Sequence, residues 1–117
     1  MQVAIVGLGL MGGSLGLALR QRASAHVVGF DLDEAEAAVA LERGCVDAIA
    51  ASLEEACATA EVIVVATPVS AIAGVIEQAL VAAPDATITD IGSTKGHVVA
   101  SVPASGRTRF VGGHPIC

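Results

Sequence analysis

The sequence predicts an α/β fold built on a doubly wound, mostly parallel sheet. Short apolar runs, such as residues 3–6 (VAIV) and 62–65 (VIVV), are typical of strands buried on both faces of a parallel sheet. Segments with helical character separate these runs in regular alternation, which favours parallel pairing with right-handed crossovers. The chain has 117 residues, 54% of them hydrophobic, so we expect one domain, residues 1–117, with ample material for a core.

A glycine-rich turn follows the first predicted strand. Its three glycines form a G-x-G-x-x-G pattern in which Gly7 turns the chain sharply and Gly9 lets the backbone approach a pyrophosphate. Gly12 lets the next helix, predicted over 14–20 with a polar connection over 20–24, pack closely on the strand. The N–H groups and dipole of that helix would favour an anion. We therefore expect a Rossmann-type dinucleotide site that includes Gly7, Leu8, Gly9, Leu10, Met11 and Gly12.

Asp31 ends the second predicted strand, residues 26–31, and lies 19 residues after Gly12. This is close to the spacing expected for the acid that binds an adenosine ribose. Its carboxylate would accept hydrogen bonds from both ribose hydroxyls but would repel a 2′-phosphate, by about 4 kcal/mol for unit charges 4 Å apart at an effective dielectric of 20. The pattern therefore favours NAD over NADP. A second role for Asp31, compatible with the first, is N-cap of the helix that begins near Asp33.

The rest of the chain continues the alternation of strands and helices. The expected elements, in order, are a helix over 33–43 closed by Gly44, a short edge strand over 46–50, a helix capped by Ser52, a strand over 61–66, a helix over 69–81 with Ile72, Val75, Ile76 and Leu80 on one side, a strand over 86–91, a helix over 97–102 and a strand over 107–111.

Conspicuous residues follow the predicted strands where each of them ends. In parallel sheets ligands bind beyond the carboxyl ends of the strands, so these residues should gather at one edge. Besides the glycine turn and Asp31, they are Thr67, Pro68, Gly92, Ser93 and His114.

His114 and Ser93 are the candidates for chemistry. A neutral imidazole at His114 could accept a proton from a substrate hydroxyl while a hydride leaves the same carbon, although a histidine that only fixes its loop fits equally well. Ser93 could hydrogen-bond the same hydroxyl or orient His114, or it could cap the following helix. Lys95, His26 and His97 are expected to be solvated.

Composition and charge exclude several classes of protein. The net charge of −6 argues against nucleic acid and anionic membranes as partners. No apolar run reaches the ~18 residues of a membrane span, and no signal peptide is recognisable. Three widely spaced cysteines, Cys45, Cys57 and Cys117, form neither a disulfide framework nor a metal site. We expect them to be packing residues in a cytoplasmic protein.

Four motifs together resemble the prephenate dehydrogenase family: residues 6–14 (VGLGLMGGS), 66–69 (ATPV), 90–96 (DIGSTKG) and 110–116 (FVGGHPI). The resemblance covers the whole chain. It implies NAD-dependent oxidation of prephenate with loss of carbon dioxide, which gives 4-hydroxyphenylpyruvate for tyrosine biosynthesis. By motif position, His114 matches the catalytic histidine and Ser93 the serine that assists it. The glycines and Asp31 match the cofactor site, and Thr67 and Pro68 the loop beside the cofactor.

The chain departs from the family in one respect. Family members continue into a helical domain that builds a homodimer and supplies an arginine for a substrate carboxylate, so the resemblance implies a chain that binds NAD without turning over prephenate. Arogenate dehydrogenase remains an alternative. A β-hydroxyacid dehydrogenase is disfavoured by the Gly-Gly-His-Pro turn that contains His114. A non-catalytic NAD-sensing module would need the glycines and Asp31 but neither Ser93 nor His114.

Overall fold

The computed structural model describes residues 1–67, 69–83, 85–90 and 110–112. Its elements are β1 (Gln2–Val6), α1 (Leu10–Arg22), β2 (His26–Phe30), α2 (Glu34–Glu42), β3 (Ala48–Ile49), α3 (Leu53–Cys57), β4 (Val62–Val65), α4 (Val69–Ala82), β5 (Thr87–Asp90) and β6 (Phe110–Gly112). The strands form one sheet in the order β3-β2-β1-β4-β5-β6, and every pairing is parallel. This order, with its reversal between β1 and β4, confirms the predicted doubly wound Rossmann-type fold.

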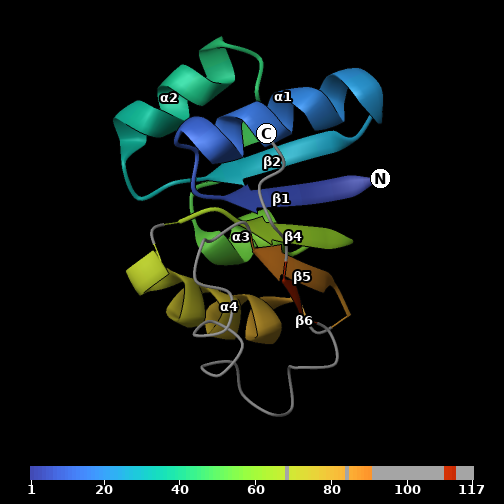
Figure 1. Ribbon diagram of the computed structural model, residues 1–117, viewed down its shortest axis with the longest axis vertical. Coiled ribbons are helices and arrows are strands. Elements are labelled where there is room, and N and C mark those ends of the chain that lie inside the picture. Colours follow the sequence, from blue (N-terminus) through green and yellow to red (C-terminus); the bar gives the residue numbers. More distant parts are fainter. Residues whose placement is uncertain (68, 84, 91–109, 113–117) are drawn as a thin grey trace.

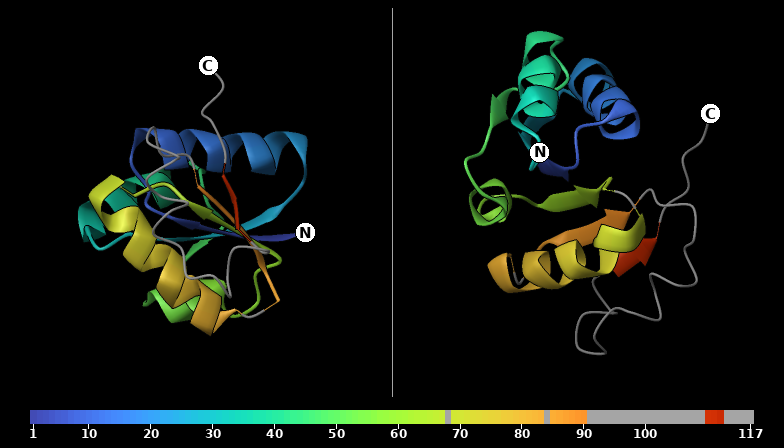
Figure 2. Two further views of the ribbon diagram at one scale, coloured as in Figure 1. Left: turned by 60° about the horizontal axis from the view of Figure 1, so that its bottom comes forward. Right: turned by 90° about the vertical axis from the view of Figure 1, so that its left-hand side faces the viewer.

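Helices cover both faces of the sheet. α1 and α2 lie on one face, and α3 and α4 lie on the other (Figures 1 and 2). Alternation along β1 explains the division: Val3 and Ile5 point into the core under α1 and α2, whereas Ala4 and Val6 point into the core under α3 and α4. All four residues are buried, as the unbroken apolar run of this strand predicts.

Helix ends differ from expectation in two places. α1 begins at Leu10 and continues to Arg22, so the polar connection expected over 20–24 is wrong at its start. Asp33, not Asp31, is the N-cap of α2, since its carboxylate accepts the N–H groups of Ala35 and Glu36. The other end of α2 is as predicted, because Gly44 follows it with a positive φ of 76°.

The strands end on one line across the sheet. Val6 of β1 is in register with Phe30 of β2 and with Val65 of β4. Val65 is in turn in register with Asp90 of β5, and Asp90 with Gly112 of β6. The residues that follow β1, β2 and β4 therefore leave the sheet side by side, which confirms the predicted convergence for Gly7, Asp31 and Thr67.

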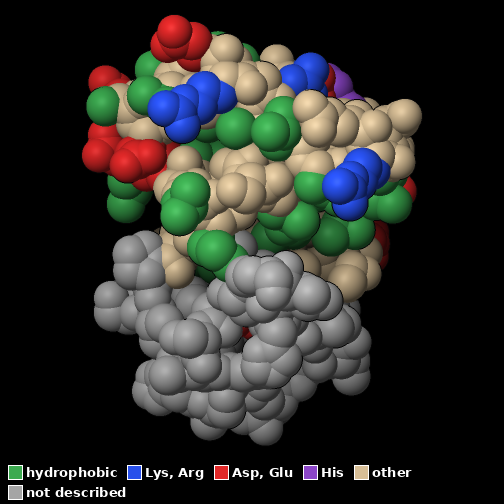
Figure 3. All heavy atoms as spheres, turned by 45° about the horizontal axis from the view of Figure 1, so that its top comes forward, with side chains coloured by type: hydrophobic (Ala, Val, Ile, Leu, Met, Phe, Trp, Pro, Cys, Tyr) green, Lys and Arg blue, Asp and Glu red, His purple; other side chains and the backbone are tan. Residues whose placement is uncertain are grey.

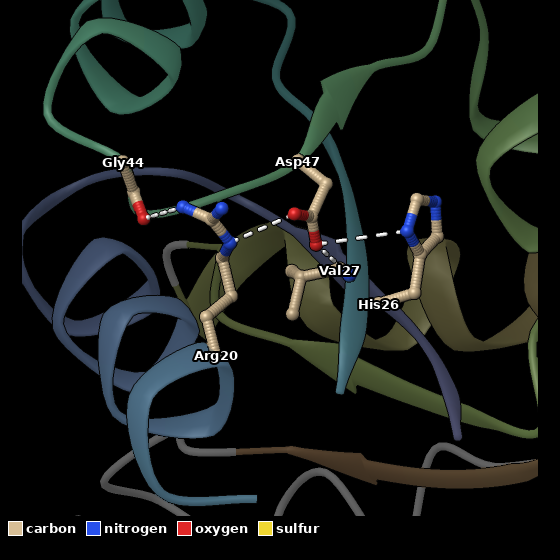
Figure 4. Close-up of polar contacts among 5 residues, drawn as sticks. All are labelled: Arg20, His26, Val27, Gly44 and Asp47. Carbon is tan, nitrogen blue, oxygen red and sulfur yellow. Dashed lines mark hydrogen bonds and ion pairs between the residues drawn. The ribbon is translucent and has the colours of Figure 1, made fainter. Parts of the chain in front are cut away.

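A polar cluster lies at the opposite end of the sheet, where β2 begins (Figure 4). Asp47 accepts the Val27 N–H at 2.7 Å and pairs with Arg20 Nε at 2.9 Å, and its other neighbour is His26, 3.7 Å away. Arg20 also donates to the Gly44 carbonyl. The Val27 N–H, opposed by burial and assisted by Arg20 and His26, lowers the pKa of Asp47 below 3.8. These contacts join the end of α1 to β2 and to the segment before β3.

Within the part of the chain that the structure describes, none of the helices is both long and apolar enough to span a membrane.

Candidate dinucleotide site

Gly7 lies where three strands meet. Its φ is +99°, and a Cβ at this position would lie 2.7 Å from the carbonyl carbon of Ala66 and 2.8 Å from the nitrogen of Thr67. Its own N–H donates to the Phe30 carbonyl at 2.8 Å. A side chain is therefore excluded both by backbone conformation and by the end of β4, as predicted from the sharp turn.

Gly12 and Gly9 have different surroundings. A Cβ at Gly12 would overlap the Gly7 carbonyl oxygen, so the glycine is required for α1 to approach the turn. No atom of the described residues lies within 4 Å of a Cβ built at Gly9, which is exposed at the outer side of the turn. The packing role of Gly12 is confirmed. The space at Gly9 is what close approach of a ligand to the backbone requires.

The first turn of α1 is open to an anion. Gly9 is the N-cap, no side chain of the described residues caps the helix, and no acidic residue lies in its first turn. The N–H groups of such a turn have no partners within the helix, and they carry the positive end of the helix dipole. Leu10 and Met11 are exposed beside it.

Asp31 ties β2 to the glycine turn. One carboxylate oxygen accepts the Leu8 N–H at 2.7 Å, and the other accepts the Asp33 N–H at 2.8 Å. The Leu8 side chain is buried, so the turn is anchored on both its backbone and its side chain. Since each carboxylate oxygen can accept two hydrogen bonds, Asp31 retains capacity for two ribose hydroxyls.

Thr67 completes the described part of the site. Its backbone nitrogen is one of the atoms that exclude a side chain at Gly7. Its hydroxyl oxygen is buried and has no hydrogen-bond partner among the described residues. A buried hydroxyl without a partner is costly and is often satisfied by a ligand. The remaining predicted site residues, Pro68, Gly92, Ser93 and His114, lie outside the described residues.

A groove between α1 and α2 was not predicted. It has a volume of about 370 Å³ and opens from the glycine turn at Leu8 and Gly9. Each helix lines it with residues spaced at i, i+3, i+4 and i+7, a pattern visible in the sequence only once the two helices are known to face each other. They are Leu10, Gly13, Ser14 and Leu17 of α1, and Glu36, Val39 and Ala40 of α2 with its C-cap Arg43.

Two cysteines behave as packing residues, as predicted. Cys45 and Cys57 are buried free thiols. Burial, with a smaller contribution from Glu54, raises the pKa of Cys57 to about 11. A thiol with such a pKa is a poor nucleophile.

Comparison with known proteins agrees with this geometry. The family model of the prephenate dehydrogenase nucleotide-binding domain matches residues 15–117. Prephenate dehydrogenase of Bacillus subtilis is 34% identical over 119 residues, which cover 97% of this chain and 32% of that protein. The crystal structure of prephenate dehydrogenase from A. aeolicus in complex with hydroxyphenyl propionate and NAD+ has a TM-score of 0.88 at 31% identity, covering 99% of this chain and 42% of that one.

A Synechocystis arogenate dehydrogenase structure has a TM-score of 0.85 at 31% identity, covering 97% of this chain and 40% of that one. The chain spans about a third of the length of the curated relatives it matches. From the match over residues 15–117, the chain belongs to the family of the prephenate dehydrogenase nucleotide-binding domain.

Proposed function

We propose that this chain binds NAD+ and is the cofactor-binding domain, residues 1–117, of an enzyme that oxidises prephenate. The observation that carries the proposal is the pairing of an uncapped α1 N-terminus with the Asp31 carboxylate, which is held by the Leu8 N–H at 2.7 Å. The α1 N-terminus suits the pyrophosphate and the Asp31 carboxylate suits a ribose diol, and the glycine turn joins the two.

The described residues fit the dinucleotide. The space beside Gly9 would admit the pyrophosphate. The Thr67 hydroxyl, which has no hydrogen-bond partner among the described residues, would donate to or accept from the cofactor beyond the ends of β1 and β4. The family match and the NAD+ in the A. aeolicus relative support the same assignment.

Bound NAD+ supplies a hydride acceptor. In the proposed reaction His114 takes the proton of the prephenate ring hydroxyl as hydride leaves the same carbon, and Ser93 holds that hydroxyl or orients His114. Loss of carbon dioxide then yields 4-hydroxyphenylpyruvate. Support for these two roles comes from the family resemblance of residues 90–96 and 110–116.

Calorimetric titration with NAD+ and, separately, NADP+ tests the cofactor assignment. We expect NAD+ to bind and NADP+ to bind at least tenfold more weakly, since a 2′-phosphate would meet the Asp31 carboxylate. Binding of neither dinucleotide would contradict the proposal. A second assay, the absorbance of NADH after addition of prephenate, is expected to give no turnover with the 117-residue chain, because the curated relatives are about three times as long.

Arogenate is the second candidate substrate, favoured by the similarity to the Synechocystis enzyme. It differs from prephenate in carrying an amino group on its side chain, so the rates with the two substrates in an enzyme containing this domain would separate the candidates. A non-catalytic NAD sensor would retain its response after substitution of His114, whereas the proposed enzyme would lose turnover.

We also propose that the intact enzyme is a cytoplasmic homodimer assembled through a helical domain. The buried free thiols Cys45 and Cys57 are compatible with a reducing compartment. Sedimentation of the intact enzyme would measure its assembly state.

A further inference from the structure

Two helix N-termini lie at the same edge of the sheet, and they have opposite preferences for an anion. α1 begins without a side-chain cap and without an acidic residue in its first turn. α2 begins with Asp33 as its cap, and Glu34 and Glu36 lie in its first turn. Negative side chains at a helix N-terminus offset the dipole and fill the N–H groups that an anion would otherwise use.

Hydrogen bonds show how the start of α2 is occupied. The Asp33 carboxylate accepts the Ala35 N–H at 2.9 Å and the Glu36 N–H at 3.4 Å. The Asp33 N–H is itself donated to Asp31 at 2.8 Å. Three N–H groups at the start of α2 and just before it are therefore already bound to carboxylates.

The groove between α1 and α2 connects this acidic turn with the proposed ribose position. Leu8, whose N–H is bonded to Asp31, lines the groove together with Gly9, Leu10 and Glu36. A phosphate on a ribose held by Asp31 would enter the groove at this end. In Figure 3 acidic side chains gather at the upper left of the molecule, over α2, next to hydrophobic side chains.

The groove is also lined by a positively charged residue, Arg43, at its other end. Arg43 follows Glu36 by seven residues, so about 10 Å of helix separates them. The attraction between Arg43 and a phosphate near Leu8 falls with distance and is screened beyond about 10 Å at 0.1 M ionic strength. Of the two charged residues that line the groove, Glu36 rather than Arg43 is thus the one that would act on a phosphate near Leu8.

We propose that Glu36, in the acidic first turn of α2, is a second specificity residue that excludes a ribose 2′-phosphate from the groove between α1 and α2. This inference rests on the proposed binding of NAD+. It makes cofactor choice a property of two elements, the end of β2 with Asp31 and the start of α2 with Glu36. Substitution of Asp31 alone is then insufficient to give a protein that prefers NADP+.

The test compares three single variants by calorimetric titration of the purified protein with NAD+ and NADP+ at fixed ionic strength. Glu36→Gln is expected to tighten NADP+ binding about fivefold and to leave NAD+ binding within twofold, because only the phosphate faces the lost charge. Glu42→Gln removes the same charge from the far end of α2 and should change neither affinity by more than twofold. Arg43→Gln is also expected to leave both affinities within twofold.

Three results would overturn the inference. One is an unchanged ratio of the two affinities in Glu36→Gln. Another is an equal gain in NADP+ affinity in Glu36→Gln and Glu42→Gln, which would indicate the net charge of the protein rather than a local contact. The third is a loss of NADP+ affinity in Arg43→Gln greater than fivefold, which would mean that the groove attracts the phosphate. Failure of the unsubstituted protein to bind NAD+ would instead reject the proposed function, and the inference with it.

Discussion

The carboxylate of Asp31 accepts the backbone N–H of Leu8 at 2.7 Å, so a side chain at the end of β2 holds the glycine turn that follows β1. Asp31 is thus a structural residue as well as a candidate ribose ligand. The two roles can be separated experimentally, because the structural role affects stability without cofactor, whereas the ribose-binding role acts only when the cofactor is present.

Asp31→Ala should lower the free energy of unfolding by about 1–2 kcal/mol in the absence of cofactor, since the Leu8 and Asp33 N–H groups lose their acceptors. It should also weaken NAD+ binding by more than about tenfold. Urea unfolding and calorimetric titration measure the two effects. Asp85→Ala, at an exposed position, is the control and should change neither quantity. A variant of Asp31 with unchanged stability would show that the Leu8 contact contributes nothing.

Gly12 and Gly13 form a matched pair. Gly12→Ala should lower stability by about 3 kcal/mol or more and abolish NAD+ binding, because the added methyl would overlap the Gly7 carbonyl oxygen. Gly13→Ala places its methyl 3.6 Å from Cys45 Sγ, an ordinary contact. It should raise stability by about 0.5–1 kcal/mol, as expected for Gly→Ala within a helix. Equal effects of the two substitutions on urea midpoints would contradict the packing described here.

Asp47 should make stability depend on acid pH. Its pKa is lower in the folded protein, chiefly because of the Val27 N–H, so its contribution is present above the unfolded value of 3.8 and is lost as the pH falls through the folded pKa. Asp47→Asn should therefore cost about 1 kcal/mol at pH 7 and progressively less as the pH falls through the folded pKa, below which the unsubstituted side chain is also neutral. Urea unfolding across a series of acid pH values measures this difference. A penalty that does not change with pH would exclude the charge as its source.

Cys57 should resist alkylation in the folded protein. Burial raises the pKa of its thiol to about 11, so at pH 8 neither the thiolate nor access for a reagent is available. Mass spectrometry after iodoacetamide treatment should find Cys57 unmodified in native protein and modified in guanidinium. Rapid native modification would show that α3 opens readily.

The sequence predicted the elements that carry their own local signals. Gly44 ends α2, and Ser52 caps α3 through its hydroxyl, which accepts the Glu55 N–H at 3.1 Å. Both helix ends could be predicted because such turns need only neighbouring residues. The end of α1 could not be placed in this way. Arg20 continues the helix and pairs with Asp47, a residue that is distant in sequence and reaches it only through the parallel order of the strands.

The same distinction applies to the candidate site. The roles of Gly7 and Gly12 followed from a short motif with a known geometry. The bond between Asp31 and Leu8 and the groove containing Glu36 depend on how β1, β2 and the two helices lie together. Pairwise proximity of this kind has no sequence pattern of its own, so it was visible only in the folded chain.

The strand order has a consequence for synthesis on the ribosome. β1 is made first yet lies at the centre of the sheet, between β2 and β4. Until residues 62–65 have emerged, β1 has an unpaired edge, and until α3 has emerged, Ala4 and Val6 have no helix over them. The nascent segment through β3 is thus a sheet with one bare apolar face, a surface that chaperones recognise and that aggregates at high concentration. Slow translation before α3 would lengthen that exposure.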